Sequence, residues 1–252
     1  MEWSGEGYIL STRKHGETSA IIDVFTRDKG RHLGLVRGGI SRKMRPVLQP
    51  GNFVRVNWRG RLSEHLGTYT VEAINSRAAE LMDDRLSLTG LNALTAMCRE
   101  MLPERETHSA IYDVFKIVIE NLHDHDIWPV LYTRWEAGLL SALGYGLDFD
   151  RCAATGSNDD LTHISPRSGR AVSASAAEPY LDKLLRLPPY MRGESYASPE
   201  DIHDGLKLMA YFLETRIQWN LNKTLPEARH QLVDRLLNDE VAKVRVPAQR
   251  PV

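Results

Sequence analysis

The chain has 252 residues, of which 42% are hydrophobic and 26% charged, and its formal net charge is −1. This composition predicts a globular protein with a buried core, and no apolar run approaches the ~20 residues that a membrane-spanning helix needs. The polar N-terminus MEWSGEG is not a signal peptide, and two cysteines, Cys98 and Cys152, give no disulfide framework, so we expect a reducing cytoplasm.

Residues 1–80 alternate apolar and polar side chains in short segments, as β-strands do. Glycine-containing turns separate the segments, and Asp28-Lys29-Gly30 is a hairpin signal. The predicted strands cover residues 8–13, 20–25, 33–37, 53–58 and 67–71. Five short strands within about 70 residues predict a small closed barrel, for which the OB-fold is the commonest five-stranded form, although an SH3-like barrel has the same pattern.

Basic side chains are concentrated between Arg27 and Arg61. This segment holds ten basic residues and one acid, a local excess of 10 − 1 = +9. Residues 1–80 hold 13 Lys and Arg against 8 Asp and Glu, and residues 81–252 hold 19 against 25. Such a concentration predicts a polyanion site in the barrel, whereas protection of an exposed sheet edge against aggregation is the alternative explanation.

We predict that this surface binds the nucleic-acid backbone without reading sequence, because no helix presents a row of base-reading side chains. Phe53 shares a predicted strand face with Arg55 and Arg59, and an aromatic ring beside guanidinium groups suits a single strand. The candidate contacts lie on the strands and on a flexible loop, residues 38–51: Arg31, Arg37, Arg42, Lys43, Arg45, Phe53, Arg55 and Arg59.

The pattern changes near Arg77 to apolar residues at helical spacing. Thr107 is the predicted cap of the second helix, and Ser198-Pro199-Glu200-Asp201 is a strong start for a later one. Cys98 lies within an apolar stripe and is expected to be buried. The predicted helices cover residues 84–102, 108–122, 128–143, 199–221 and 226–237, within a helical domain of residues 81–240 that is followed by a frayed tail, residues 241–252.

Residues 148–178 interrupt the helical pattern. A long irregular run in a compact domain indicates an insertion with its own role. Leu161–Ile164 and Arg170–Ser173 read as the strands of a small hairpin around the turn Ser165–Gly169.

Several features together resemble the RecO family of bacterial recombination mediators. They are the basic barrel, the helical remainder, the run Leu143-Gly144-Tyr145-Gly146-Leu147-Asp148 before Cys152, and the opening segments Gly7–Leu10, Glu17–Ser19 and Gly30–Gly38. The resemblance implies an α+β protein whose N-terminal OB-fold binds single- and double-stranded DNA, without catalytic activity or a cofactor. It also implies pairing with RecR, binding of the C-terminal tail of single-stranded-DNA-binding protein, annealing of strands and help in loading RecA onto coated DNA.

One departure from the family concerns zinc. Some relatives hold the metal between two CxxC pairs on either side of a Ser-Pro-x-x-Gly turn. Here the turn remains, but the first pair reads Cys152-Ala153-Ala154-Thr155, and Ser173 and Ala176 occupy the second. One thiolate with His163 nearby cannot form a closed tetrahedral site. We therefore predict a zinc-finger-like insertion that lacks its metal ligands.

The resemblance also implies a site for the acidic, phenylalanine-ended tail of single-stranded-DNA-binding protein. Such a tail needs a cation and an apolar pocket, and Arg134 with Trp135, on the predicted helix of residues 128–143, are the candidates. Pairing of Arg134 with a helix carboxylate such as Glu136 is the alternative.

Two other functions stay open. An OB-fold RNA-binding protein has the same sequence pattern. A metal-dependent phosphohydrolase could use a cluster drawn from His108, His123, Asp124, Asp126, His203 and Asp204. Against an enzyme, the sequence contains no GxxxxGKS/T loop, no GxSxG elbow and no HExxH motif.

Overall fold

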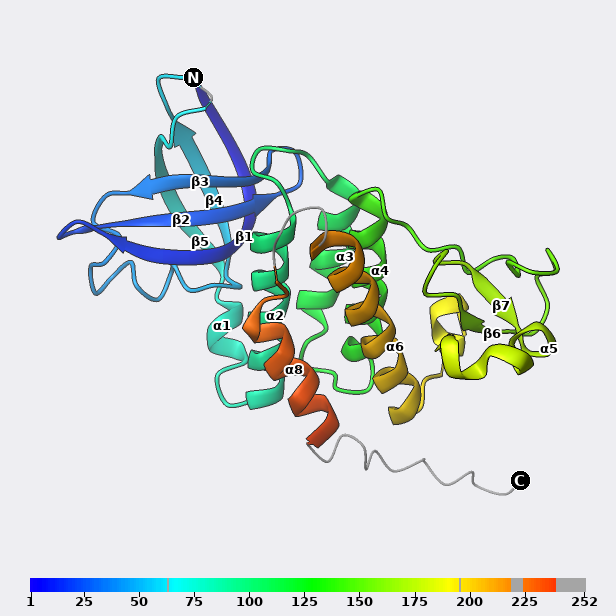
Figure 1. Ribbon diagram of the computed structural model, residues 1–252. Coiled ribbons are helices and arrows are strands. Elements are labelled where there is room, and N and C mark those ends of the chain that lie inside the picture. Colours follow the sequence, from blue (N-terminus) through cyan, green and yellow to red (C-terminus); the bar gives the residue numbers. More distant parts are fainter. Residues whose placement is uncertain (63, 195, 219–223, 239–252) are drawn as a thin grey trace, which may run out of the picture. The chain divides into compact units, whose positions relative to one another are not determined.

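The alternating N-terminal segments form the five strands of a closed barrel. The computed structural model describes residues 1–62, 64–194, 196–218 and 224–238. The strands are β1 (Glu2–His15), β2 (Ser19–Thr26), β3 (Gly30–Val36), β4 (Phe53–Arg59) and β5 (Thr68–Asn75), in the order β1-β2-β3-β5-β4 (Figure 1). Neighbours pair antiparallel except β3 and β5, which meet in parallel at the pair Leu35 and Thr68. This is the OB-fold, so the predicted barrel is confirmed.

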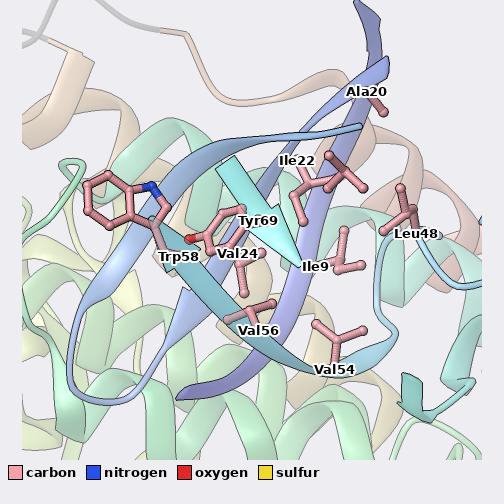
Figure 2. Close-up of a cluster of buried hydrophobic side chains, with 10 residues drawn as sticks. Ile9, Ala20, Ile22, Val24, Leu48, Val54, Val56, Trp58 and Tyr69 are labelled. Carbon is pink, nitrogen blue, oxygen red and sulfur yellow. The ribbon is translucent and has the colours of Figure 1, made fainter. Parts of the chain in front are cut away.

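Inward-facing side chains fill the barrel (Figure 2). In Figure 2, Leu48 lies near one end of this cluster and Trp58 at the other, and both are buried. The Trp58 indole Nε1 donates a hydrogen bond to the Leu66 carbonyl at 3.0 Å. Its ring also covers Gly67, where an added Cβ would lie 2.4 Å from the indole. Only glycine therefore fits at this position beside the ring.

The segment between β3 and β4 consists of consecutive hydrogen-bonded turns. The Arg45 amide donates to the Ser41 carbonyl at 3.0 Å, and the Leu48 amide donates to the Met44 carbonyl at 3.0 Å, which is the helical i to i−4 pattern. Ile40, Met44, Val47 and Leu48 pack on the barrel core at helical spacing. The sequence predicts a flexible loop here. The structure shows a run of helical turns whose apolar side chains pack against the barrel core, and the flexibility of the loop stays a prediction.

Asn52 fastens the end of this segment. Its side chain is 1% exposed. The amide nitrogen donates to the carbonyls of Pro46 at 2.8 Å and Val47 at 3.1 Å. The amide oxygen accepts from the backbone nitrogen of Ala78 at 3.1 Å, within α1 (Arg77–Glu80). One side chain therefore joins the loop to the first helical turn after the barrel.

The described chain divides into two compact units. The first contains residues 1–123 with 225–231, and the second contains residues 124–194, 196–218, 224 and 232–238. The short helix α8 (Glu227–Asn238) has residues in both. The predicted division into domains of residues 1–80 and 81–240 stays a prediction, because compactness alone does not define a domain that folds independently.

In the first unit, the barrel is followed by α2 (Arg85–Met101) and α3 (Ser109–Glu120). Cys98 is fully buried in α2, as predicted. The predicted cap of α3 is wrong, because the helix begins after His108 and the Thr107 hydroxyl donates instead to the Asp28 carbonyl at 3.2 Å. The turn from β2 to β3 is held to α3 by Arg27, whose guanidinium makes two hydrogen bonds of 2.9 Å to the Asp113 carboxylate.

The second unit contains α4 (Trp128–Ala142) and α6 (Pro199–Phe212). The predicted helix start at Ser198 is confirmed, and Ser198 and Asp201 form a capping box there, each side chain accepting a hydrogen bond from the backbone of the other. A π-helix (Leu213–Gln218) replaces the α-helix after Phe212, so the predicted single α-helix to Leu221 is interrupted. The predicted end of this α-helix at Leu221 lies outside the described residues, and so does the predicted tail, residues 241–252.

The insertion in the second unit holds the predicted hairpin. Strands β6 (Leu161–Ile164) and β7 (Ala171–Ser173) pair antiparallel, and β8 (Leu185–Arg186) adds to the other edge of β6. The short helices α5 (Ala174–Ala177), η1 (Glu178–Lys183) and η2 (Pro189–Arg192) complete it. Across the residues that the structure describes, no helix is long and apolar enough to cross a lipid bilayer.

Candidate nucleic-acid interface

Six exposed cations lie at one end of the barrel, on the β1–β2 hairpin and the β3–β4 segment. Contacts join the two segments, since the Thr12 hydroxyl donates to the Leu48 carbonyl at 2.5 Å and the Ile40 amide donates to the Thr18 carbonyl at 3.3 Å. In Figure 1 both segments project from the same end of the barrel. We call this surface the basic end, and it consists of Arg13, Lys14, Arg37, Arg42, Lys43 and Arg45.

The basic end has an unbalanced charge. Each of its six side chains is exposed, and none forms an ion pair with another residue of the described chain. Glu17, at the tip of the hairpin, is the one acid in residues 12–18 and 37–50. Sequence reasoning missed Arg13 and Lys14, although two adjacent cations beside a predicted turn were a signal. The fold adds them to four of the predicted contacts.

Arg55 and Arg59 lie on the outer face of β4 and are paired with carboxylates from β1. The Arg59 guanidinium lies 2.9 Å from Glu2, and the Arg55 guanidinium lies 2.8 Å from Glu6 and 3.9 Å from Glu72 on β5. Two arginines therefore face three glutamates, so this strand face is not basic. Exposed pairs of this kind are worth at most about 1 kcal/mol, so a phosphate could displace a glutamate at little cost.

The side chains of Arg31 and Phe53 contact other residues of the first unit. The Arg31 guanidinium is 3.4 Å from the Asp23 carboxylate, and the two side chains are 14% and 2% exposed. The Phe53 ring packs against Tyr8, with ring centroids 4.8 Å apart, and Tyr8 in turn contacts Phe115 of α3. Neither residue joins the basic end. Phe53 shares the outer face of β4 with Arg55 and Arg59, as predicted, but its ring is half-buried, and a role of this ring in binding stays a prediction.

The Asp23–Arg31 pair gives a pH-dependent stability. Burial raises the pKa of Asp23 from 3.8 to about 6, against the smaller lowering effect of Arg31. Because the folded protein holds this proton more tightly than the unfolded chain, ionisation of Asp23 destabilises the fold as the pH rises from about 4 to about 6. The full penalty is on the order of 3 kcal/mol. The Asp23→Asn variant cannot ionise at this position and should not show this loss of stability.

Chemical unfolding of both proteins at about pH 4 and about pH 7 tests this expectation. The free energy of unfolding of wild type, relative to Asp23→Asn, should fall by about 2–3 kcal/mol between the two pH values. Asp28→Asn is the control, because Asp28 is 82% exposed. A difference between wild type and Asp23→Asn that does not change with pH would contradict the assignment.

A groove of about 470 Å³ opens along the seam between β3 and β5. It is lined by Val36 and Arg37 at the end of β3, Met44 of the following segment, Arg59 of β4, and Thr68 to Val71 of β5. Arg37 belongs to the basic end and Arg59 to the paired strand face. The groove therefore brings together two predicted contact residues that are 22 positions apart in the sequence (59 − 37 = 22).

The predicted partner residues have structural contacts within the second unit. The Arg134 guanidinium donates to the carbonyl of Tyr190 at 2.5 and 3.0 Å and to the carbonyl of Glu194 at 3.1 Å, so it holds the end of η2. Trp135 is fully buried. The site for an acidic tail at these two residues stays a prediction, and these contacts add no support to it.

The residues at the two former CxxC positions do not fit a zinc ion. Cys152 is 1% exposed, and its sulfur accepts a hydrogen bond from the Ser173 amide at 3.3 Å and lies 3.4 Å from the Ser173 hydroxyl. A metal needs several such ligands around it. Within residues 1–62, 64–194, 196–218 and 224–238, no three His, Cys, Asp or Glu side chains are grouped to hold a metal. The histidines and aspartates considered for the phosphohydrolase alternative are therefore not grouped as a metal site in this part of the chain.

The closed barrel, its unpaired cations and the helices that follow define an OB-fold protein with a helical C-terminal region. Two family models match the chain: the model described as Recombination protein O N terminal matches residues 1–77, and Recombination protein O C terminal matches residues 82–225. The chain belongs to the RecO family of DNA repair proteins.

The chain is similar to curated relatives over almost its whole length. It is 48% identical over 237 residues to the DNA repair protein RecO of Ruegeria sp. (strain TM1040), which is 94% of this chain and 98% of that protein. It is 49% identical over 237 residues to that of Cereibacter sphaeroides, covering 94% and 99% of the two chains. It is 46% identical over 240 residues to that of Methylorubrum extorquens (strain PA1), covering 92% and 97%.

Proposed function

We propose that the protein binds DNA without catalysis, through the basic end of its barrel, as a recombination mediator in DNA repair. The observation that supports this most directly is a group of six exposed cations on two adjoining segments, with no carboxylate paired to any of them among the described residues. Cations that neutralise phosphates release the counterions condensed on DNA, and this release drives binding to any sequence.

The contacts in this proposal differ from the sequence prediction. Arg37, Arg42, Lys43 and Arg45 are kept, and Arg13 and Lys14 are added. Arg55 and Arg59 take a secondary role, because each must break its ion pair with a glutamate before it can bind a phosphate. Arg31 and Phe53 are left out. Side chains at a strand end and on turns position a phosphate backbone but carry no row of base contacts, so the binding is independent of sequence.

The steps of mediation rest on family membership and on the resemblance in sequence. They are annealing of complementary strands, contact with RecR, contact with the C-terminal tail of single-stranded-DNA-binding protein, and help in loading RecA onto coated DNA. The names of the relatives state DNA repair alone. On this proposal the protein acts in the cytoplasm, at the nucleoid.

Titration of a labelled single-stranded oligonucleotide and of its duplex, across a salt series, tests the proposal. The logarithm of the binding constant should fall linearly with the logarithm of the salt concentration, with a slope that reflects several phosphate contacts. RNA of the same sequence distinguishes the RNA-binding alternative, because it differs at the 2′-hydroxyl. Absence of salt-dependent binding to DNA would refute the proposal, and a strong preference for RNA would favour the alternative.

A further inference from the structure

We propose that the groove at the β3–β5 seam is the seat of one unpaired nucleotide of single-stranded DNA. Its base would lie on the groove floor, and its phosphate between Arg37 and Arg59. This inference rests on the proposed function and deepens it. The basic end attracts any DNA backbone, whereas the groove would make the barrel distinguish a single strand from a duplex.

The groove exists because the barrel is closed weakly at this seam. The backbones of β3 and β5 pair at Leu35 and Thr68, supported by a hydrogen bond of 3.1 Å from the Leu35 amide to the Gly67 carbonyl. Beyond that pair β3 ends at Val36, while β5 continues to Asn75. The hollow left between them, about 470 Å³, lies within the range of about 300–1,000 Å³ found for small-ligand sites.

The groove has the surface that a nucleobase requires. Val36 and Tyr69 are buried in its floor, and Met44 and Val71 are half-buried beside them. A thioether makes favourable contacts with aromatic rings, so Met44 suits the flat face of a base. On β5, Thr70 is exposed, and its hydroxyl can both donate and accept at the polar edge of the base.

Two guanidinium groups line the same groove and supply the charge for a phosphate. Arg37 is exposed and lies in the basic end, so the groove is continuous with the surface that attracts DNA. Arg59 is 75% exposed and holds the Glu2 carboxylate at 2.9 Å. A guanidinium binds carboxylate and phosphate with the same planar fork. Glu2 therefore occupies the position that a phosphate oxygen would take on Arg59.

A base in a duplex cannot reach the groove. It is paired and stacked, and extruding it costs a few kcal/mol. A base in a single strand enters without that cost. The groove should therefore add affinity for single strands, while the basic end contributes equally to both forms of DNA. Because the floor is apolar and the rim carries hydroxyls, we expect this site to accept all four bases.

The first test compares DNA probes on the full-length wild-type protein. A single-stranded homopolymer with bases should bind about ten-fold more tightly than an abasic strand of equal length, since contact with one base is worth roughly 1–3 kcal/mol. Equal binding of these two probes would overturn the groove site and leave the proposed function standing. Failure of the protein to bind any of the probes, duplex included, would overturn the proposed function itself.

The second test uses Thr70→Glu, which places a carboxylate in the groove, and Ile74→Glu as its matched control. Ile74 lies on the same strand, is 45% exposed and does not line the groove. Thr70→Glu should remove the ten-fold preference for bases, whereas Ile74→Glu should retain it. Both variants should bind duplex alike, because their net charges are the same. Retention of the preference in Thr70→Glu would refute the site, and thermal unfolding of both variants checks that each is folded.

Discussion

Replacement of Arg42, Lys43 and Arg45 together by glutamine is expected to weaken DNA binding by about two to three orders of magnitude at ~0.1 M salt. Each phosphate contact that is lost should reduce the salt slope by about 0.9, so the slope should flatten by nearly three units. Glutamine removes the charge, keeps a polar side chain and suits helical turns. The three side chains are exposed, so the fold should remain intact. Fluorescence anisotropy over a salt series measures both quantities.

A control with the same change in net charge separates contact from long-range attraction. Lys116, Arg167 and Arg186 are exposed and lie outside the barrel. Their replacement by glutamine also removes three charges, and it should change the salt slope by much less than one unit, because no phosphate contact is lost. If both triple variants flatten the slope equally, the basic end is not the DNA-binding surface.

Trp58→Ala is expected to reduce the free energy of unfolding by about 3–5 kcal/mol. The ring is 1% exposed and stacks on Trp3, with ring centroids 6.2 Å apart. Gly60 and Gly67 pack against it, so no neighbouring side chain at these positions can fill the cavity. The variant also loses the hydrogen bond to the Leu66 carbonyl. Urea unfolding followed by circular dichroism measures the loss.

Two further variants show whether the effect comes from the cavity. Trp58→Phe keeps most of the ring and should lose clearly less stability than Trp58→Ala. Trp3→Ala, at a half-buried position on the same cluster, should also lose less. A loss below about 1 kcal/mol for Trp58→Ala would mean that the barrel repacks around the missing ring.

The strands were predictable from sequence because alternation within a strand is local, whereas the partner of each strand is not. Arg55 and Arg59 were correctly placed on the outer face of β4, but their counter-charges, Glu6 and Glu2, come from the opposite end of the barrel sequence. Register between strands that are distant in sequence decides which charges meet. The excess of basic residues between Arg27 and Arg61 therefore predicted a more positive outer face of β4 than the folded barrel has.

The partial burial of Arg31 is predictable from the residues that share its face of β3. Leu33 and Leu35 share the outer face of β3 with Arg31, and all three are half-buried. Leucines at outward positions indicate a covered face, and the chain between α2 and α3 covers it, since the Arg105 amide donates to the Arg31 carbonyl at 2.7 Å. Trp135 is similar, because it lies at helical spacing from Tyr132 and Leu139, and all three side chains of α4 are buried.

The hydrogen bonds of Asn52 couple the β3–β4 loop to the backbone of α1, so the state of the loop can be measured at an amide outside it. Hydrogen exchange at the Ala78 amide requires that the bond to Asn52 open, and the same side chain holds the turns at Pro46 and Val47. On the proposed function, a polyanion that rigidifies the loop should slow exchange at this single amide, which lies in the first helical turn after the barrel. If the loop binds DNA as proposed, thermodynamic reciprocity requires that whatever immobilises α1 should also strengthen that binding.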